Sequence, residues 1–391
     1  MINFDFISPT RIIFGKEKEK EIGKIISSYG FSSVLLVYGG ESVKRIGAYD
    51  SVANSLKENG ITFKELKGVR PNPEVSSVIE GVRIAKEIRA ELILALGGGS
   101  PIDCAKAIAA YYYHDGDFMD YSLGKATLTK ALPVGVILTV SGAGSEASNS
   151  CVISSDSLNI KKGFHSDLVR PLFAIENPEL TYSVSLRQTA IGAVDAIMHS
   201  LERYLCPSSN DELADSFALD ICRNLKDSLL VCMKNPHDYD VRANLMVGST
   251  LSHNGLTGIG KQTRFAIHPL QAAIGGLHPE HVHGEGVGIL YIGYCKVMMD
   301  QLEDKLASIA KILFNIDYID KRKAAIMGVE AWKDFLKSLS LAASLSEIGI
   351  VESDLQSFAD LVTGNGTRVV GCCRRPLDRE MALEAYRACL R

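Results

Sequence analysis

One run of the sequence most strongly constrains the fold: residues 90–109, AELILALGGGSPIDCAKAIA, join an apolar segment to a helical one through three glycines. The apolar segment is typical of a buried strand, and Pro101 suits the first turn of a helix. Glycines allow backbone N–H groups to approach a ligand, and a helix N-terminus attracts negative charge. The run therefore predicts a phosphate-binding turn, with a purely structural turn as the alternative, because it lacks the spacing of the G-x-G-x-x-G fingerprint.

Two further apolar runs, residues 32–40 and 131–140, also read as buried strands, and helical spacing fills 51–60 and 76–89. Strands that alternate with helices in this order predict a parallel sheet covered by helices. A second glycine turn, Gly39-Gly40, follows the first of these strands. Two glycine turns at the strand ends of one sheet suit a dinucleotide better than a single phosphate.

The pattern of the sequence changes near residues 177–190. Strand-like and helix-like runs alternate before this point, and long helical patterns dominate after it. A chain of 391 residues is also too long for one ordinary core. We therefore predict an α/β dinucleotide-binding domain with a parallel sheet over residues 1–182. An all-α domain over residues 183–391 is expected to follow, with the active site in the cleft between the two.

The composition excludes several classes of protein. A formal charge of −4 argues against a nucleic-acid or membrane-surface partner, which would require a basic patch. The chain has no apolar run long enough for a membrane helix and no pattern of a signal peptide at its start. Its nine cysteines are odd in number and form no C-x-x-C pair, so neither a disulfide framework nor a zinc ribbon is indicated. We expect a cytoplasmic protein with reduced thiols.

A candidate metal site begins in IGAVDAIMHSLERY, residues 191–204, where Asp195 and His199 stand four positions apart. On a helix this spacing places both side chains on one face. A simple ion pair is the plain interpretation, and half of a divalent metal site is the more specific one. Four histidines cluster downstream and could complete a set of one oxygen and three nitrogens, which suits Zn²⁺ or Fe²⁺. They are His268, His278, His281 and His283, and composition does not decide among them.

Nine motifs, in order and at compatible spacing, resemble the iron-containing (group III) alcohol dehydrogenases, especially their butanol dehydrogenase branch. They are PTRIIFGK, YGGESVKRIGAYD, GVRPNP, GGGSPIDCAKAIA, GSEA, NPEL, AVDAIMHSLERY, IHPL and HGEGVGI, and they span nearly the full chain. The resemblance implies a metal-dependent enzyme that transfers a hydride between NAD(P)(H) and a small to medium primary alcohol or aldehyde. It also implies a homodimer, with Fe²⁺ as the metal and Zn²⁺ as the alternative.

The resemblance carries specific roles onto residues of this chain. It implies that the metal ligands are Asp195, His199, His268 and His283. It implies that the cofactor contacts Gly39, Gly40, Ser42, Gly98, Gly99, Ser100, Asp103, Thr139, Ser145 and Lys162, with the pyrophosphate at Gly98–Ser100. No side chain is assigned as an essential general base beyond the metal ligands.

Three positions depart from the family pattern. Glu41 stands where the NADP-using branch has a third glycine, and its charge would repel a 2′-phosphate. Ala143 replaces a usual threonine of the cofactor loop. Ala272 occupies the place of a histidine proposed as a proton relay, which leaves His278 or His281 as substitutes. We expect an enzyme that uses both NADP and NAD, with a mild preference for NADP.

Two other kinds of protein compete with this interpretation. A glycerol dehydrogenase or dehydroquinate synthase would share the glycine loop but differ around the metal ligands. A non-catalytic dinucleotide-binding or self-assembling module would not need an intact ligand set. The spacing of Asp195 and His199, together with HGEG, favours the alcohol dehydrogenases over both.

Overall fold

The computed structural model describes residues 2–158, 160–207 and 212–391. Proximity of Cα atoms divides the chain into two compact units. The sheet unit comprises Ile7–Val184 together with Pro236–Thr250. The helical unit comprises Ser185–Asn235 and Leu251–Arg391, together with the N-terminal residues as far as Phe6.

The sheet unit contains six parallel strands in the order β1-β8-β5-β4-β2-β3. Their bounds are β1 Arg11–Phe14, β2 Ser33–Tyr38, β3 Thr62–Leu66, β4 Leu92–Gly97, β5 Val134–Leu138 and β8 Phe173–Glu176. The predicted strands at 32–40, 90–99 and 131–140 are confirmed as β2, β4 and β5. Along β2 and β4 nearly every residue is buried, because a parallel sheet of this kind has helices on both faces.

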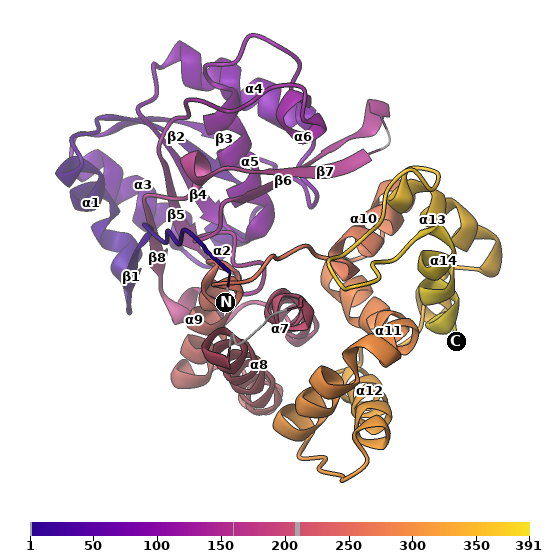
Figure 1. Cartoon of the computed structure of the whole chain (residues 1–391). Helices are drawn as coiled ribbons and strands as arrows, with labels where there is room; N and C mark the ends of the chain where they lie inside the picture. Colours follow the sequence, from indigo (N-terminus) through magenta and orange to yellow (C-terminus); the bar gives the residue numbers. More distant parts are fainter. Residues whose placement is uncertain (1, 159, 208–211) are drawn as a thin grey trace. The chain divides into compact units, whose positions relative to one another are not determined.

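Helices cover both faces of the sheet (Figure 1). Alternate side chains of its strands enter two separate cores. Leu36 of β2 packs with α1 (Ile22–Ser28) and α3 (Ala48–Glu58) on one face. Leu35, its neighbour, packs with α4 (Val75–Glu87) and α5 (Gly99–Tyr111) on the other. The period of two along a strand thus converts a continuous apolar run into two covered faces.

Three features of the sheet unit were not expected from the sequence. An antiparallel hairpin joins β6 (Ser150–Ser155) to β7 (Ile160–His165). The unit also contains two short helices that the sequence did not predict, α2 (Ser42–Arg45) and α6 (Asp120–Leu123). The chain also returns to this unit at Pro236–Thr250, where Met246 of α9 (Tyr239–His253) joins the α4–α5 core. Because of this segment, neither compact unit is one continuous range of the chain. The division into a domain over 1–182 and a domain over 183–391 stays a prediction.

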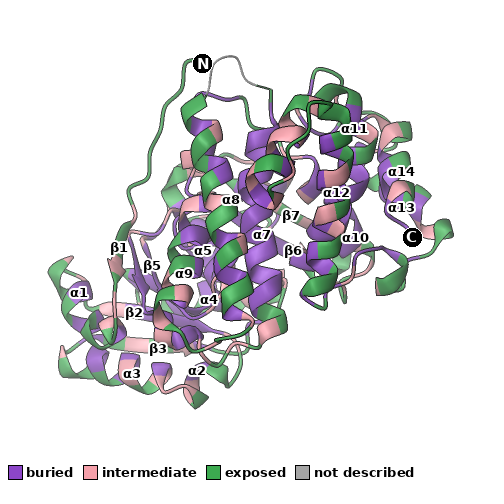
Figure 2. Cartoon of the chain, turned by 90° about the horizontal axis from the view of Figure 1, so that it is seen from below, coloured by how far each residue is buried: buried purple, intermediate pink, exposed green. Residues whose placement is uncertain are grey.

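The helical unit is built from seven further helices, and the described residues after β8 contain no strand. They are α7 Leu186–Leu205, α8 Glu212–Cys232, α10 Ile267–Leu277, α11 His283–Phe314, α12 Lys321–Ser338, α13 Leu355–Thr363 and α14 Arg379–Ala388. Helix α7 is buried on every side from Thr189 to Leu205, as Figure 2 shows. A helix with buried residues all round its circumference lies inside the fold rather than on its surface.

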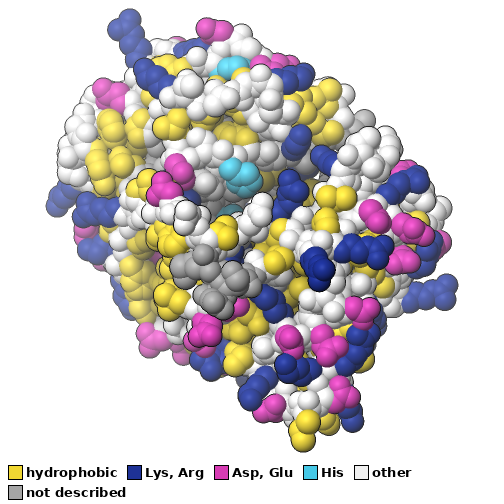
Figure 3. All heavy atoms as spheres, viewed as in Figure 1, with side chains coloured by type: hydrophobic (Ala, Val, Ile, Leu, Met, Phe, Trp, Pro, Cys, Tyr) yellow, Lys and Arg dark blue, Asp and Glu magenta, His cyan; other side chains and the backbone are white. Residues whose placement is uncertain are grey.

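The surface agrees with the weak net charge. Basic and acidic side chains are interspersed over the face shown in Figure 3, which is typical of a surface without a dominant electrostatic field. None of the described helices combines the length and the hydropathy that crossing a membrane requires.

Candidate active site

Helix α7 of the helical unit carries Asp195 and His199 at buried positions. The helix begins after Ser185, whose side chain accepts a hydrogen bond from the backbone N–H of Gln188 at 3.2 Å. Only 7% of Asp195 and 5% of His199 is exposed. A carboxylate at this depth is costly unless a positive charge compensates it, so the position indicates a site rather than a polar helix edge.

Helix α11 approaches α7 closely at its first turn, where His283 stands. A Cβ atom at Gly284 would lie 2.5 Å from the carbonyl oxygen of Ile191, so this contact requires glycine. Arg187 of α7 also donates to both carboxylate oxygens of Glu285, at 3.0 and 2.8 Å. The His-Gly-Glu sequence therefore serves packing as well as chemistry, because it fixes the start of α11 against α7.

The four predicted metal ligands come from three helices, and the structure brings them together. Ligand atoms of Asp195, His199 and His268 all lie within 4.8 Å of one another. His283 is outside this set of three, but its Nε2 atom lies 3.6 Å from Asp195 Oδ1, and the Nε2 atom of His268 lies 3.4 Å from the same oxygen. Two atoms that each lie about 2.1 Å from a tetrahedral ion are about 3.4 Å apart, so both separations fit ligands of one cation.

Two residues that sequence reasoning missed fix the orientation of these histidines. Glu202, one turn beyond His199 on α7, binds Nδ1 of His268 and accepts the backbone N–H groups of Ala266 and Ile267 at 2.6 Å. Gln271 binds Nδ1 of His283 through its side-chain oxygen. With Nδ1 engaged, each ring presents Nε2 to Asp195, which is how outer partners orient metal-binding histidines. The sequence signal that could have found Glu202 is its spacing from Asp195, because residues seven positions apart lie on the same face of a helix.

Electrostatics also fit a cation in this cluster. Burial, opposed by the charge of Asp195 and aided by those of His268, Arg203 and His283, holds the pKa of His199 well below its ordinary value. The ring is therefore neutral and able to bind a metal. Its Nδ1 atom is buried without a hydrogen-bond partner among the described residues. Burial opposes the charged form of His268, yet Glu202 and Asp195 outweigh it and raise the pKa of His268 to about 9. Without a cation, a proton on His268 compensates the two carboxylates.

The pattern of bonds around Glu202 gives a testable prediction. Both carboxylate oxygens of Glu202 accept hydrogen bonds, from the backbone N–H groups of residues 266–268 and from the His268 ring. In Glu202→Gln, the amide nitrogen takes the place of one of these oxygens and cannot accept such a bond. We expect divalent metal affinity to fall roughly 10- to 100-fold in a folded protein, as measured by competition with a chelator. The matched control is Glu280→Gln, since Glu280 is an exposed carboxylate on the α10–α11 connection. Equal affinities in the two variants would remove Glu202 from the site.

The glycine loop lies between β4 and α5, as the sequence predicted. Gly98 has extended backbone, α5 begins at Gly99, and Ser100 belongs to its first turn. These three residues are partly exposed, although the strand before them is buried. A Cβ atom at Gly99 would lie 3.1 Å from the Cβ of Ala143, so the 140–145 segment packs directly against the loop. The geometry fits an exposed anion cradle at a helix N-terminus.

A buried hydrogen-bond chain holds the segment beyond this loop. Asp103 accepts a hydrogen bond from the Ser145 hydroxyl at 2.7 Å and from the Val152 backbone N–H at 3.2 Å. Lys106, which sequence reasoning missed, is fully buried and donates to the Ser145 hydroxyl at 2.9 Å and to the carbonyl of Ser150 at 2.8 Å. Burial lowers the pKa of Lys106 to about 8 and raises that of Asp103.

Other predicted cofactor residues lie around the carboxyl ends of the strands. The backbone N–H of Thr139, directly after β5, donates to the carbonyl of Gly97 at 3.0 Å. Lys162 is an exposed residue of β7. The charge of Lys106, and with it that of Lys161 beside Lys162, partly offsets the effect of burial on the pKa of Asp103. A cofactor contact of Lys162 stays a prediction.

The second glycine turn connects β2 to α2. Gly39 and Gly40 follow β2, and Glu41 precedes Ser42, the first residue of α2. The side chain of Glu41 is 67% exposed, and its carboxylate lies 3.4 Å from Nζ of Lys44. Lys44 therefore partly neutralises Glu41, and solvent screens the rest of its charge.

The two candidate substitutes for the missing relay histidine form a second cluster. His278 Nδ1 lies 3.2 Å from a Glu280 carboxylate oxygen, and His281 Nε2 lies 3.9 Å from the same atom. A proton-relay role for either histidine stays a prediction.

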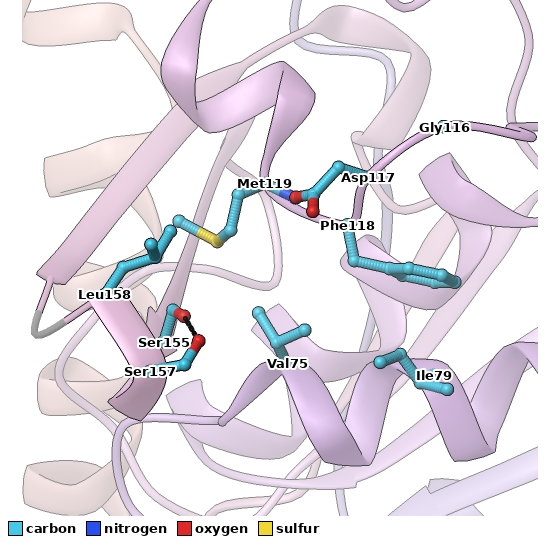
Figure 4. Close-up of a pocket in the computed structure, with 9 residues that line it drawn as sticks. All are labelled: Val75, Ile79, Gly116, Asp117, Phe118, Met119, Ser155, Ser157 and Leu158. Carbon is cyan, nitrogen blue, oxygen red and sulfur yellow. Dashed lines mark hydrogen bonds between the residues drawn. The ribbon is translucent and has the colours of Figure 1, made fainter.

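A pocket of about 330 Å³ lies in the sheet unit near the β6–β7 hairpin (Figure 4). Val75 and Ile79 of α4 form one wall, and Phe118, Met119 and Leu158 lie opposite them. None of the predicted cofactor residues lines this pocket. It is therefore separate from the glycine loops.

Two family models match successive parts of the chain. Residues 9–178 match the family model of iron-containing alcohol dehydrogenases, and residues 189–388 match the model of the C-terminal part of that family. NADH-dependent butanol dehydrogenase A of Clostridium acetobutylicum is 37% identical, over 99% of each chain. The NADPH-dependent aldehyde reductase YqhD of Escherichia coli is 31% identical, over 95% of each chain.

Solved structures agree with these relatives. The crystal structure of NADH-dependent butanol dehydrogenase A from Thermotoga maritima is similar with a TM-score of 0.95 and 33% identity, covering 100% of this chain and 99% of that one. The two family models, the full-length relative and the similar structure agree with one another. The chain belongs to the iron-containing alcohol dehydrogenase family.

Proposed function

We propose that Asp195, His199, His268 and His283 hold the divalent cation with which this alcohol dehydrogenase and aldehyde reductase acts on a small to medium primary alcohol or aldehyde. The observation that supports the proposal is the convergence of two Nε2 atoms on Asp195 Oδ1, at 3.4 and 3.6 Å. When bound, the cation supplies a Lewis acid for the substrate oxygen. The protein contributes a pre-oriented ligand set, of which Asp195 and His199 are buried.

The nature of the cation follows from the donor set and the family. Three imidazoles and one carboxylate accept both Fe²⁺ and Zn²⁺. The family is named for iron, which favours Fe²⁺, and Zn²⁺ is the alternative. The intact ligand set also favours an enzyme over a non-catalytic dinucleotide-binding module.

For the cofactor we propose that backbone N–H groups of Gly98, Gly99 and Ser100 bind the pyrophosphate at the start of α5. Asp103, held in place by Ser145 and Val152, would contact the nicotinamide ribose. The remaining proposed contacts are Gly39, Gly40, Ser42, Thr139, Ser145 and Lys162. Hydride transfer itself belongs to the chemistry of the nicotinamide, and the protein fixes its position.

We further propose NADH as the preferred cofactor, in place of the mild preference for NADP inferred from the sequence. Both butanol dehydrogenases of Clostridium acetobutylicum that resemble this chain are named NADH-dependent. Glu41 adds a negative charge where a 2′-phosphate would lie. Because Glu41 is paired with Lys44, it discriminates only modestly between NADH and NADPH, so NADPH would also be used.

Substitution of Glu41 tests this cofactor preference. Glu41→Gly is expected to raise the ratio of kcat/KM with NADPH to that with NADH by roughly 3- to 10-fold, since an exposed, paired carboxylate contributes about 1 kcal/mol. Glu41→Gln keeps the size of the side chain and should reproduce most of the change. An unaltered ratio in both variants would show that Glu41 points away from the ribose.

The function as a whole is tested by anaerobic reconstitution. Metal-free protein is loaded with Fe²⁺, with Zn²⁺ or with buffer, and oxidation of NADH and NADPH is followed with butanal and with shorter and longer aldehydes. We expect turnover only in the metal-loaded samples, and faster turnover with NADH. Turnover that survives complete metal removal would contradict the proposed site, and its absence with every aldehyde would contradict the proposed substrate class. The homodimer and the cytoplasmic location stay predictions of the family resemblance.

A further inference from the structure

The helical unit brings two cysteines that are far apart in sequence into direct contact, and neither is a proposed metal ligand. The sulfur atoms of Cys206 and Cys372 lie 2.6 Å apart, although 166 positions separate them. Cys206 is the C-cap residue of α7, and Cys372 lies in the segment between α13 and α14. The two cysteines are not joined by a disulfide in this structure. Thiols in such contact need little backbone movement to form a disulfide.

The surroundings of the pair differ for the two sulfurs. Cys206 is buried, whereas Cys372 is partly exposed and therefore open to a small oxidant. Contact with Cys206 lowers the pKa of the Cys372 thiol, while the same contact, together with burial, raises that of Cys206. A thiol that ionises readily and is exposed is the one that reacts with an oxidant, and a thiol beside it can resolve the product.

The adjacent cysteine, Cys373, is placed differently. It is buried, and its sulfur lies 3.3 Å from the hydroxyl group of Tyr294. Gly371 precedes the pair with a positive φ of 89°, and a Cβ atom there would lie 3.1 Å from that of Ala266. With the backbone held in this way, the side chain of Cys372 contacts Cys206 at the end of α7, and the side chain of Cys373 contacts Tyr294.

We propose that Cys206 and Cys372 are a peroxide-sensitive modification site that closes to an intramolecular disulfide. The Cys372 thiol loses its proton, and its thiolate attacks one oxygen of hydrogen peroxide. The O–O bond breaks to give a sulfenic acid and hydroxide, which takes up that proton to form the first water. The Cys206 sulfur then attacks the sulfenic sulfur, gives up its proton, and displaces the second water. Two thiols are oxidised and one peroxide is reduced to two waters. The inference is independent of the proposed function, because it uses none of the metal or cofactor residues.

Peptide mapping of the full-length protein tests the cross-link. The metal-loaded protein is treated with hydrogen peroxide, its remaining thiols are blocked, and it is digested with trypsin without reduction. We expect residues 204–223 to be joined to residues 369–374, which are the tryptic peptides that contain the pair. The joined peptide should be lost in Cys206→Ser and in Cys372→Ser and kept in the matched control Cys373→Ser. Its persistence in Cys206→Ser, or a bond between Cys372 and Cys373 instead, would overturn the proposal.

Thermal unfolding supplies a second measurement that does not depend on activity. A disulfide that closes a loop of this length removes much entropy from the unfolded chain, so the apparent Tm of the oxidised protein should rise by about 5 °C or more. The rise should be reversed by a thiol reductant and should be absent in Cys206→Ser. Oxidation that lowers the Tm of the native sequence and of Cys373→Ser alike would contradict a disulfide that fits the native fold.

Discussion

His283→Ala is expected to abolish alcohol oxidation, with kcat/KM reduced about a thousandfold or more, and to leave the protein folded. His283 is the first residue of α11, and its side chain is 31% exposed, so its removal deletes little of the core. The imidazole supplies one of the four proposed ligand atoms, and a cation that polarises the substrate contributes several kcal/mol to the transition state. Metal analysis, circular dichroism and steady-state kinetics on the same preparation separate loss of the metal from loss of the fold.

The neighbouring histidine provides the matched control for this prediction. His281→Ala removes an imidazole two positions earlier, from a side chain that lies beside Glu280 rather than Asp195. We expect it to keep its metal, whatever its effect as a candidate proton relay. Full metal occupancy in His283→Ala would move the fourth ligand to His281 or His278.

Gly99→Val should weaken the binding of NADH and NADPH by about two orders of magnitude without changing metal content. A valine side chain begins with a Cβ only 3.1 Å from that of Ala143, and its methyl groups would extend into the space that the pyrophosphate is proposed to occupy. The first turn of α5 would shift, and the N–H groups of the cradle would shift with it. Fluorescence titration of the cofactor and metal analysis measure the two properties separately.

A graded variant distinguishes contact with the ligand from simple disorder of the loop. Gly99→Ala adds only the Cβ atom, for which Ala143 would have to move by a few tenths of an ångström. We expect a loss of cofactor affinity between those of the native protein and Gly99→Val. Unchanged affinity in both variants would mean that the glycine run is only a structural turn.

Local patterns in the sequence determined the elements that carry the site. Strand β4, the glycine turn and α5 could be predicted because burial of a parallel strand and the start of a helix depend on adjacent residues. The placement of Asp195 and His199 on one face of α7 follows likewise from the helical period. The resemblance to a family then selected His268 and His283 from four candidates, and the structure brings both to Asp195.

Contacts between distant residues were decided only by the tertiary structure. Glu202 meets His268 across 66 positions, and Lys106 meets Ser145 across 39. No period along the chain relates such residues, because their proximity depends on how α7, α10 and α11 pack and on how the loop after β5 folds back on α5. The return of Pro236–Thr250 to the sheet unit has the same origin, since Met246 finds its apolar neighbours there. The sequence alone determined which groups can bind a metal and a phosphate, and packing decided which side chains hold those groups in place.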